Sequence, residues 1–176
     1  MLRHLIETEP SAGRPPHPAR AKQHGFVGFE IALALVVLAI GAYLGFTGWQ
    51  KLQQRACGER FADEVRVLSA ALENCHRKLG KWPAAAREGE VPEGIAVYLS
   101  PGKWPDTTPI GGRYVWTPPT AGRPATLEVT AFGSDAPLTA ARADLRAIDL
   151  LLDDGNLTTG RFRTGFNGWP VWRVSP

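Results

Sequence analysis

The hydrophobic and polar positions divide the chain into stretches with different patterns. Residues 26–49 are apolar throughout, apart from Glu30 and Thr47. As an α-helix this run is roughly 36 Å long, which exceeds the hydrocarbon thickness of a bilayer, about 30 Å. The pattern therefore predicts a membrane-spanning helix. Tyr43 and Trp49 lie towards its far end, where amphipathic rings favour the interface.

After this run, apolar residues recur at alternating steps of four and three, which is the period of one face of an α-helix. The stripe consists of Phe61, Val65, Leu68, Leu72, Cys75 and Leu79. Gly80 follows, and glycine favours the conformation that ends many helices. The sequence therefore predicts that the helix continues over residues 50–80 and covers a soluble domain with its apolar stripe.

Residues 81–125 are rich in proline and glycine, which predicts loops with a short strand at residues 113–117. The alternation of residues 126–132 predicts a second strand. Five tryptophans occur in this domain: Trp82, Trp104, Trp116, Trp169 and Trp172. They could form a platform that stacks on carbohydrate, but tryptophans more often fill the core of a small sheet domain, and we favour the core.

A second helix is predicted within residues 137–163, with one apolar face formed by Leu138, Ala141, Leu145, Ile148 and Leu152. Asp153, Asp154, Gly155 and Asn156 end it. Two interpretations of this acidic turn remain open, a structural turn without metal or a calcium site, although the spacing is not that of an EF-hand. We favour the structural turn and predict no metal ligand and no cofactor. The predicted fold class is α+β, with a long N-terminal helix packed on a small antiparallel sheet and a globular domain over residues 81–176.

The two cysteines are predicted not to pair with each other. Cys57 and Cys75 are separated by five helical turns, which places their Cα atoms about 27 Å apart in an intact helix. A disulfide needs a Cα separation below about 7 Å. Cys75 belongs to the apolar stripe and is expected to be a small buried side chain, whereas Cys57 could be free or pair between subunits.

Composition and charge narrow the function further. The chain has 44% hydrophobic and 21% charged residues and a net charge of +3, of which residues 1–25 carry +2. The nearly neutral remainder argues against a nucleic-acid partner. Residues 1–25 are rich in proline and lack apolar periodicity, which predicts a flexible tail. Because Arg14, Arg20 and Lys22 precede the only span, we place this tail in the cytoplasm.

The sequence offers no catalytic constellation. Three of the four histidines lie in residues 1–25, which leaves His76 beside the long helix. There is no phosphate-binding loop, no H-E-x-x-H motif and no paired-cysteine metal motif. We therefore expect a protein that is not an enzyme.

The start of the apolar run carries a more specific signal. A basic leader ends at Gly25, Phe26 follows, and Glu30 is the fifth residue after the glycine, ahead of about twenty apolar residues. This arrangement resembles the class III signal of type IV pilins and type II secretion pseudopilins. The Gly-Lys-Trp-Pro turn at residues 80–83 is similar to the loop after the first helix in major pseudopilins.

The resemblance implies processing and assembly. A prepilin peptidase would cut between Gly25 and Phe26 on the cytoplasmic side and N-methylate Phe26. Glu30 would then pair with the α-amine of Phe26 on a neighbouring subunit. The implied partners are this peptidase, other pilin or pseudopilin subunits, an inner-membrane assembly platform and membrane lipid. The implied location is the bacterial inner membrane, with a periplasmic pilin-like domain, and a filament after assembly.

Other interpretations of the same residues are possible. An ordinary secretory signal has an apolar run of about 7–15 residues, which is much shorter than this one. Glu30 could be a tolerated charge near the membrane interface. The chain could also be a permanently anchored periplasmic binding module that does not polymerise. The Gly25-Phe26 context favours the prepilin interpretation, because a plain anchor has no use for a cleavage signal.

Overall fold

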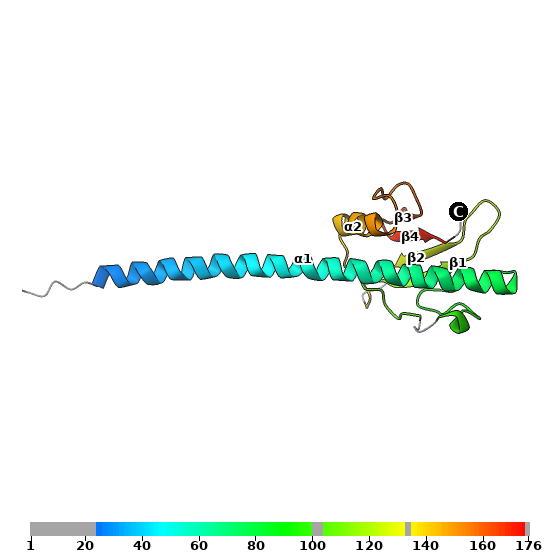
Figure 1. Ribbon diagram of the computed structural model, residues 1–176, viewed down its shortest axis with the longest axis horizontal. Helices are drawn as coiled ribbons and strands as arrows, with labels where there is room; N and C mark the ends of the chain where they lie inside the picture. Colours follow the sequence, from blue (N-terminus) through cyan, green and yellow to red (C-terminus); the bar gives the residue numbers. More distant parts are fainter. Residues whose placement is uncertain (1–23, 100–103, 133–134, 175–176) are drawn as a thin grey trace, which may run out of the picture. The chain divides into compact units, whose positions relative to one another are not determined.

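We describe a computed structural model of the chain over residues 24–99, 104–132 and 135–174. The elements, in chain order, are α1 (His24–Leu79), a 3₁₀ turn η1 (Ala96–Tyr98), β1 (Arg113–Thr117), β2 (Thr126–Thr130), α2 (Arg142–Leu152), β3 (Phe162–Thr164) and β4 (Pro170–Arg173) (Figure 1). The chain divides into two compact units, Met1–Leu44 and Gly45–Pro176. Of the predicted leader, residues 1–23 lie outside the described residues.

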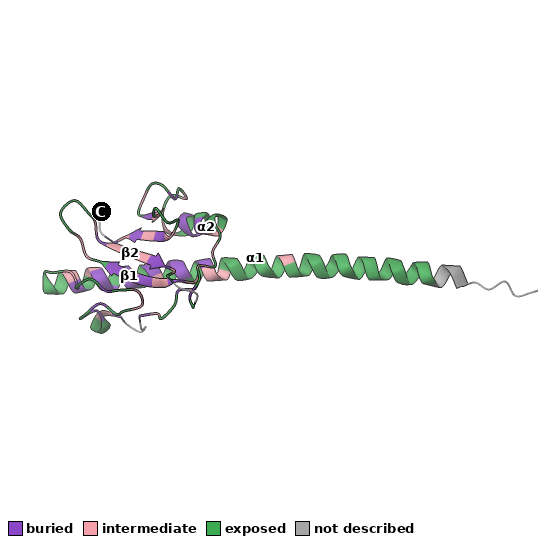
Figure 2. Ribbon diagram, turned by 180° about the vertical axis from the view of Figure 1, so that it is seen from behind, coloured by how far each residue is buried: buried purple, intermediate pink, exposed green. Residues whose placement is uncertain are grey.

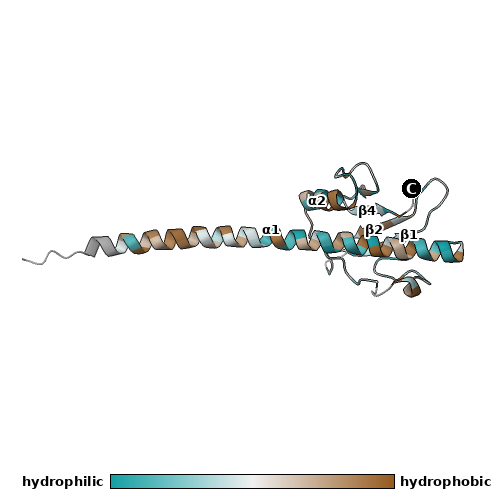
Figure 3. Ribbon diagram, in the orientation of Figure 1, coloured by the Kyte–Doolittle hydropathy of each residue, from teal (hydrophilic) through white to brown (hydrophobic). Residues whose placement is uncertain are grey.

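The described part of the first unit belongs to α1. Its side chains from Gly28 to Leu44 are exposed, and most of them are apolar, as the colouring of Figure 3 shows. Within the described residues, α1 is long and apolar enough to cross a membrane. The sequence prediction of one long N-terminal helix is confirmed.

The second unit contains a four-stranded antiparallel sheet in the order β1-β2-β4-β3. The register aligns one residue from each strand, because Trp116 pairs with Leu127, Leu127 with Trp172, and Trp172 with Phe162. Directly paired residues project from the same face of a sheet. All four of these side chains are buried, so this row forms the centre of the face that packs into the core.

The later part of α1 covers this face. The Phe61 ring stacks on Tyr114 of β1 at 6.1 Å between centroids and meets Phe162 of β3 edge-on at 6.2 Å. The predicted stripe is buried at Phe61, Val65, Leu68, Leu72 and Cys75, in the alternation of buried and exposed positions seen in Figure 2. The fold class predicted from the sequence, α+β with a long helix and a small antiparallel sheet, is thus observed.

Leu79 was wrongly assigned to the buried stripe, because its side chain is 53% exposed. It is the last residue of α1, one turn beyond Cys75. Gly80 then ends the helix in a left-handed conformation, with φ of 69° and its amide donating to the carbonyl of His76. The predicted stop at Gly80 is confirmed.

The tryptophans are distributed between the core and its margin. Trp104, Trp116 and Trp172 are buried, and Trp82 packs against the core from a partly exposed position. Trp169 instead meets the exposed ring of Phe132 edge-on at 4.6 Å. The prediction that tryptophans supply core mass therefore holds for most of the five, with Trp169 outside the cluster.

Two element boundaries differ from the sequence prediction. β2 ends at Thr130 rather than residue 132, and Phe132 is exposed. α2 begins at Arg142, after the carboxylate of Asp144 accepts a hydrogen bond from the Ala141 amide at 2.9 Å. Ala141 is therefore an exposed residue before the helix rather than part of its buried face.

Both cysteines are free. Cys75 is buried in the stripe on α1, as predicted, and Cys57 is half-buried on the same helix. The absence of a bridge between them agrees with the helical separation.

Candidate functional site

The predicted processing and assembly residues lie at the start of α1. Gly25 and Phe26 belong to its first turn, and their side chains lie outside the described ones. Glu30 is described and exposed. Its neighbours Phe29 and Ile31 are 68% and 56% exposed, so the carboxylate projects from an otherwise apolar helix surface.

Among the residues that the structure describes, Glu30 has no cationic partner. A carboxylate in an apolar setting is unfavourable unless it is solvated or paired. A partner for Glu30 in a water-poor environment would therefore have to come from outside the described residues, either from the rest of the chain or from another molecule. This arrangement can support intermolecular ion pairing.

Four glycines on α1 leave open space on its surface. A methyl group built on Gly28, Gly41, Gly45 or Gly48 would meet no atom within 4 Å. Small residues allow membrane helices to approach closely. The glycines therefore offer places where another helix could pack against α1.

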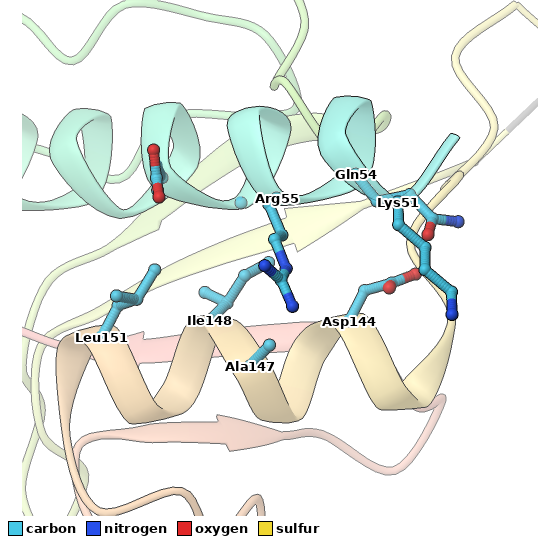
Figure 4. A pocket seen from close by; sticks show the side chains of 9 residues that line it. Lys51, Gln54, Arg55, Asp144, Ala147, Ile148 and Leu151 are labelled. Carbon is cyan, nitrogen blue, oxygen red and sulfur yellow. The ribbon is translucent and has the colours of Figure 1, made fainter. Parts of the chain in front are cut away.

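A groove lies between α1 and α2 in the second unit. It holds about 450 Å³ and is lined by Lys51, Arg55 and Gly58 of α1 and by Asp144, Ile148 and Leu151 of α2. Arg55 extends from α1 towards α2 across the groove (Figure 4). The groove combines apolar and charged side chains.

His76, the histidine outside the leader, stacks on Trp82. The two rings are 4.3 Å apart between centroids and inclined by only 3°. The imidazole thus lies flat against an indole at the edge of the core, a packing role.

Glu64 is a half-buried acid on the part of α1 that covers the sheet. The Tyr114 hydroxyl donates to the carboxylate of Glu64 at 3.2 Å. Burial raises the pKa of Glu64, and the hydrogen bond from Tyr114 opposes this shift. Burial, followed by the adjacent carboxylate, raises the pKa of Tyr114 well above its usual value. In the sequence, Glu64 lies off the apolar stripe, and nothing in its position indicates this contact.

We expect Glu64→Gln to stabilise the protein at neutral pH. An acid whose pKa is raised on folding favours the folded state most at low pH, and this contribution falls as pH rises from the ordinary value of 4.5 through the raised one. Glutamine can still accept from Tyr114 without a buried charge. Thermal melts at pH 4 and pH 7 should show a gain in Tm that is larger at pH 7.

The matched control is the exposed Glu93→Gln, which should change Tm little at either pH. A Glu64→Gln variant that melts below the parent chain at pH 7 would show that the ionised carboxylate is stabilising.

The acidic turn after α2 is held by its own side chains. The carboxylate of Asp153 accepts from the amides of Arg161 and Phe162. The Asp154 carboxylate accepts from the Asn156 amide at 2.8 Å and from the Thr159 hydroxyl at 2.8 Å. These contacts lower the pKa of Asp154. Both residues therefore form a structured turn, whichever interpretation of its metal binding holds.

Asp149 is a buried residue that the sequence interpretation did not place on the apolar face of α2. Leu145, Ile148 and Asp149 are the buried residues of this helix. Ile148 and Asp149 lie three and four residues after Leu145, and this spacing places all three on one face of the helix. The helical position of Asp149 therefore indicated its burial. The sequence prediction missed it because only apolar residues were assigned to the buried face.

Comparisons of the chain with known protein families, with curated proteins and with solved structures returned no match.

Proposed function

We propose that the chain is a prepilin-like structural subunit, a pseudopilin or minor pilin. A prepilin peptidase would process it between Gly25 and Phe26, and α1 would carry it into a type II secretion pseudopilus or a type IV pilus. The observation that carries the proposal is the Gly25-Phe26 pair with Glu30 five residues after the glycine, at the head of a long exposed apolar helix.

The exposed surface of α1 supports an assembly role. Large apolar side chains such as Leu38, Tyr43 and Phe46 are more than 60% exposed. Such a surface requires lipid or other protein around it. Before assembly the bilayer would surround α1 with lipid. After assembly the packed helices of a filament core would surround it with protein.

The unpaired carboxylate supports the same proposal. In the bilayer, Glu30 near the helix start can reach the headgroups, which reduces its transfer cost. Between packed helices it requires a cationic partner. Cleavage before Phe26 creates an α-amine that can fill this role.

The proposed location follows from the charge distribution. Basic residues precede the apolar run, which favours a cytoplasmic N-terminus in a bacterial inner membrane. The unit Gly45–Pro176 would then lie in the periplasm. Its separate compactness is consistent with a domain displayed on the outside of a filament.

Processing is the direct test. Co-expression with a prepilin peptidase should remove 25 residues and leave Phe26 as the new N-terminus. Gly25→Leu should abolish cleavage, because a bulky side chain would occupy the position before the scissile bond. The matched control is Gly41→Leu, at a position with open space around it, which should be cleaved normally. Intact-mass measurement and N-terminal sequencing provide the readout.

The same experiment separates the proposal from a permanent membrane anchor. A peptidase that processes a known prepilin in the same cells but leaves this chain intact would favour the anchor. A cut at another bond would remove the main support for the prepilin interpretation.

A further inference from the structure

The groove between α1 and α2 is lined by two charges of each sign. Lys51, Arg55 and Glu59 line it from α1, and Asp144 lines it from α2. Within the described residues, none of these four side chains takes part in an ion pair. The groove therefore presents cationic and anionic groups that can bind charges of a ligand.

The floor of the groove is apolar. Gly58 is buried, and a Cβ built on it would lie 3.1 Å from the Ile148 side chain, so the glycine lets the two helices approach each other there. Ile148 is buried, and Leu151 is 46% exposed. The groove holds about 450 Å³, and sites for small molecules typically measure about 300–1,000 Å³. It can therefore accept a charged group with an apolar part attached.

The groove begins where the exposed apolar surface of α1 ends. Phe46, Trp49 and Leu52 are each more than 60% exposed. Tryptophan favours the headgroup level of a membrane, and the headgroup layer is about 5–8 Å thick on each side. At a rise of about 1.5 Å per residue, Lys51 and Arg55 follow Trp49 by about 3 Å and 9 Å. Long basic side chains extend towards headgroups. With α1 in a bilayer, both cations therefore reach the headgroup layer.

Asp144 provides a carboxylate at the same level. It lies at the end of the groove where Lys51 lies, and Arg55 extends towards α2 beside it (Figure 4). Asp144 is half-buried and accepts from the Ala141 amide through one oxygen, which leaves the other oxygen able to accept from a ligand. Glu59 lies about one helical turn beyond Arg55, outside the headgroup layer. Two cations and one carboxylate thus lie at headgroup level.

We infer that the groove binds a phospholipid headgroup that carries both a phosphate and a primary ammonium group, as in phosphatidylethanolamine. The Arg55 guanidinium donates to the phosphate oxygens, for which its planar geometry is favourable, and Lys51 supplies a second positive charge. The ammonium group donates to the Asp144 carboxylate. The apolar floor contacts the glycerol part of the lipid. A purely anionic headgroup would leave Asp144 without a cation.

The inference rests on one part of the proposed function, the crossing of a membrane by α1, and not on cleavage or assembly. Peptidase cleavage requires insertion into the membrane. A chain that is cleaved but shows no lipid preference would therefore contradict only the lipid site. A chain that shows the preference but is never cleaved would contradict only the prepilin proposal.

Native mass spectrometry of the full-length chain, released from non-ionic detergent micelles, tests the inference. Dioleoyl phosphatidylethanolamine, phosphatidylcholine and phosphatidylglycerol are added in separate titrations. Phosphatidylethanolamine should bind at least about 10-fold more tightly than the other two lipids, since hydrogen bonds to charged groups are strong. The trimethylammonium group of phosphatidylcholine donates no hydrogen bond, and the second glycerol of phosphatidylglycerol carries no cation.

Two variants separate the two halves of the headgroup. Arg55→Gln should weaken the binding of all three lipids, because all three contain the phosphate. Asp144→Asn should reduce the affinity for phosphatidylethanolamine to that for phosphatidylcholine without weakening phosphatidylglycerol. Asparagine can still accept from the Ala141 amide, so the start of α2 is preserved, and circular dichroism checks the fold. The control Arg77→Gln, at an exposed cation near the end of α1, should bind all three lipids as the parent chain does.

Three results would overturn the inference. Equal binding of the three lipids would indicate lipid distributed around the apolar helix. Tighter binding of phosphatidylglycerol than of phosphatidylethanolamine would mean that Lys51 and Arg55 select negative charge alone. An Asp144→Asn variant that keeps the parent preference would show that no ammonium group binds at this carboxylate.

Discussion

Glu30→Gln should leave the chain inserted and cleaved but largely absent from filaments. Glutamine has nearly the same size and retains hydrogen bonding, while the charge is lost. Insertion should not suffer, because removing a charge eases transfer into the membrane. Breaking a buried ion pair costs on the order of 3–5 kcal/mol. At about 1.4 kcal/mol per factor of ten, docking of each added subunit would weaken by roughly 100-fold or more.

Two measurements on the same variant separate these effects. Peptidase processing in membranes reports insertion, and the fraction recovered in sheared or secretion-linked filaments reports assembly. Glu30→Asp should be intermediate, because the charge remains on a shorter side chain. Glu93→Gln, an exposed acid of the second unit, should assemble normally. Normal filament incorporation of Glu30→Gln would leave Glu30 as a tolerated interfacial charge.

The long helix was predictable because its signals are local. An apolar run followed by a stripe with a period of three and four residues specifies a helix wherever it is placed, and Gly80 marks its end through its own backbone. The same stripe identified most of the core on α1. Leu79 shows the limit of this reasoning, since burial depends on whether another element reaches the last turn, and the helical period carries no information about that.

The short strands were harder to predict. β3 and β4 have three and four residues. They pair with each other, and β4 also pairs with β2, which precedes α2 in the sequence. Phe162 and Trp172 are buried because the sheet places them in one row with Leu127. Such pairing arises from tertiary contacts, which override weak local preferences. β3 and β4 could not be recognised for this reason, whereas β1 and most of β2 were predicted, and the small antiparallel sheet of the predicted fold class is observed.

Asp149 shows a different limit. Its helical position predicts burial, but an isolated aspartate on an apolar face gives no indication of what neutralises it. The turn residues Asp153 and Asp154 were recognisable as an acidic cluster from adjacency alone. Only the three-dimensional structure brings the buried carboxylate to them, because the link depends on how α2 ends.

Trp116→Ala should cause the largest loss of stability among single substitutions in the second unit. The side chain is 0% exposed and lies at the β1 end of the buried row across the sheet. Its indole nitrogen donates to the Pro83 carbonyl at 3.1 Å, and its ring lies 5.7 Å from that of Trp82. It therefore joins the sheet to the loop that follows α1. Truncation would open a cavity and leave a buried carbonyl without its donor.

The expected cost is about 3–5 kcal/mol, a large share of the roughly 5–15 kcal/mol that stabilises a typical domain. Thermal melts followed by near-ultraviolet circular dichroism should show Tm lower by about 6–20 °C. Trp116→Phe retains most of the apolar volume but loses the donor to Pro83, so its effect should be intermediate. The matched control is Trp169→Ala, whose contact with Phe132 at the margin should be worth only about 1 kcal/mol. Equal melting of the two alanine variants would mean that the loop after α1 is held independently of Trp116, contrary to its contacts with Pro83 and Trp82.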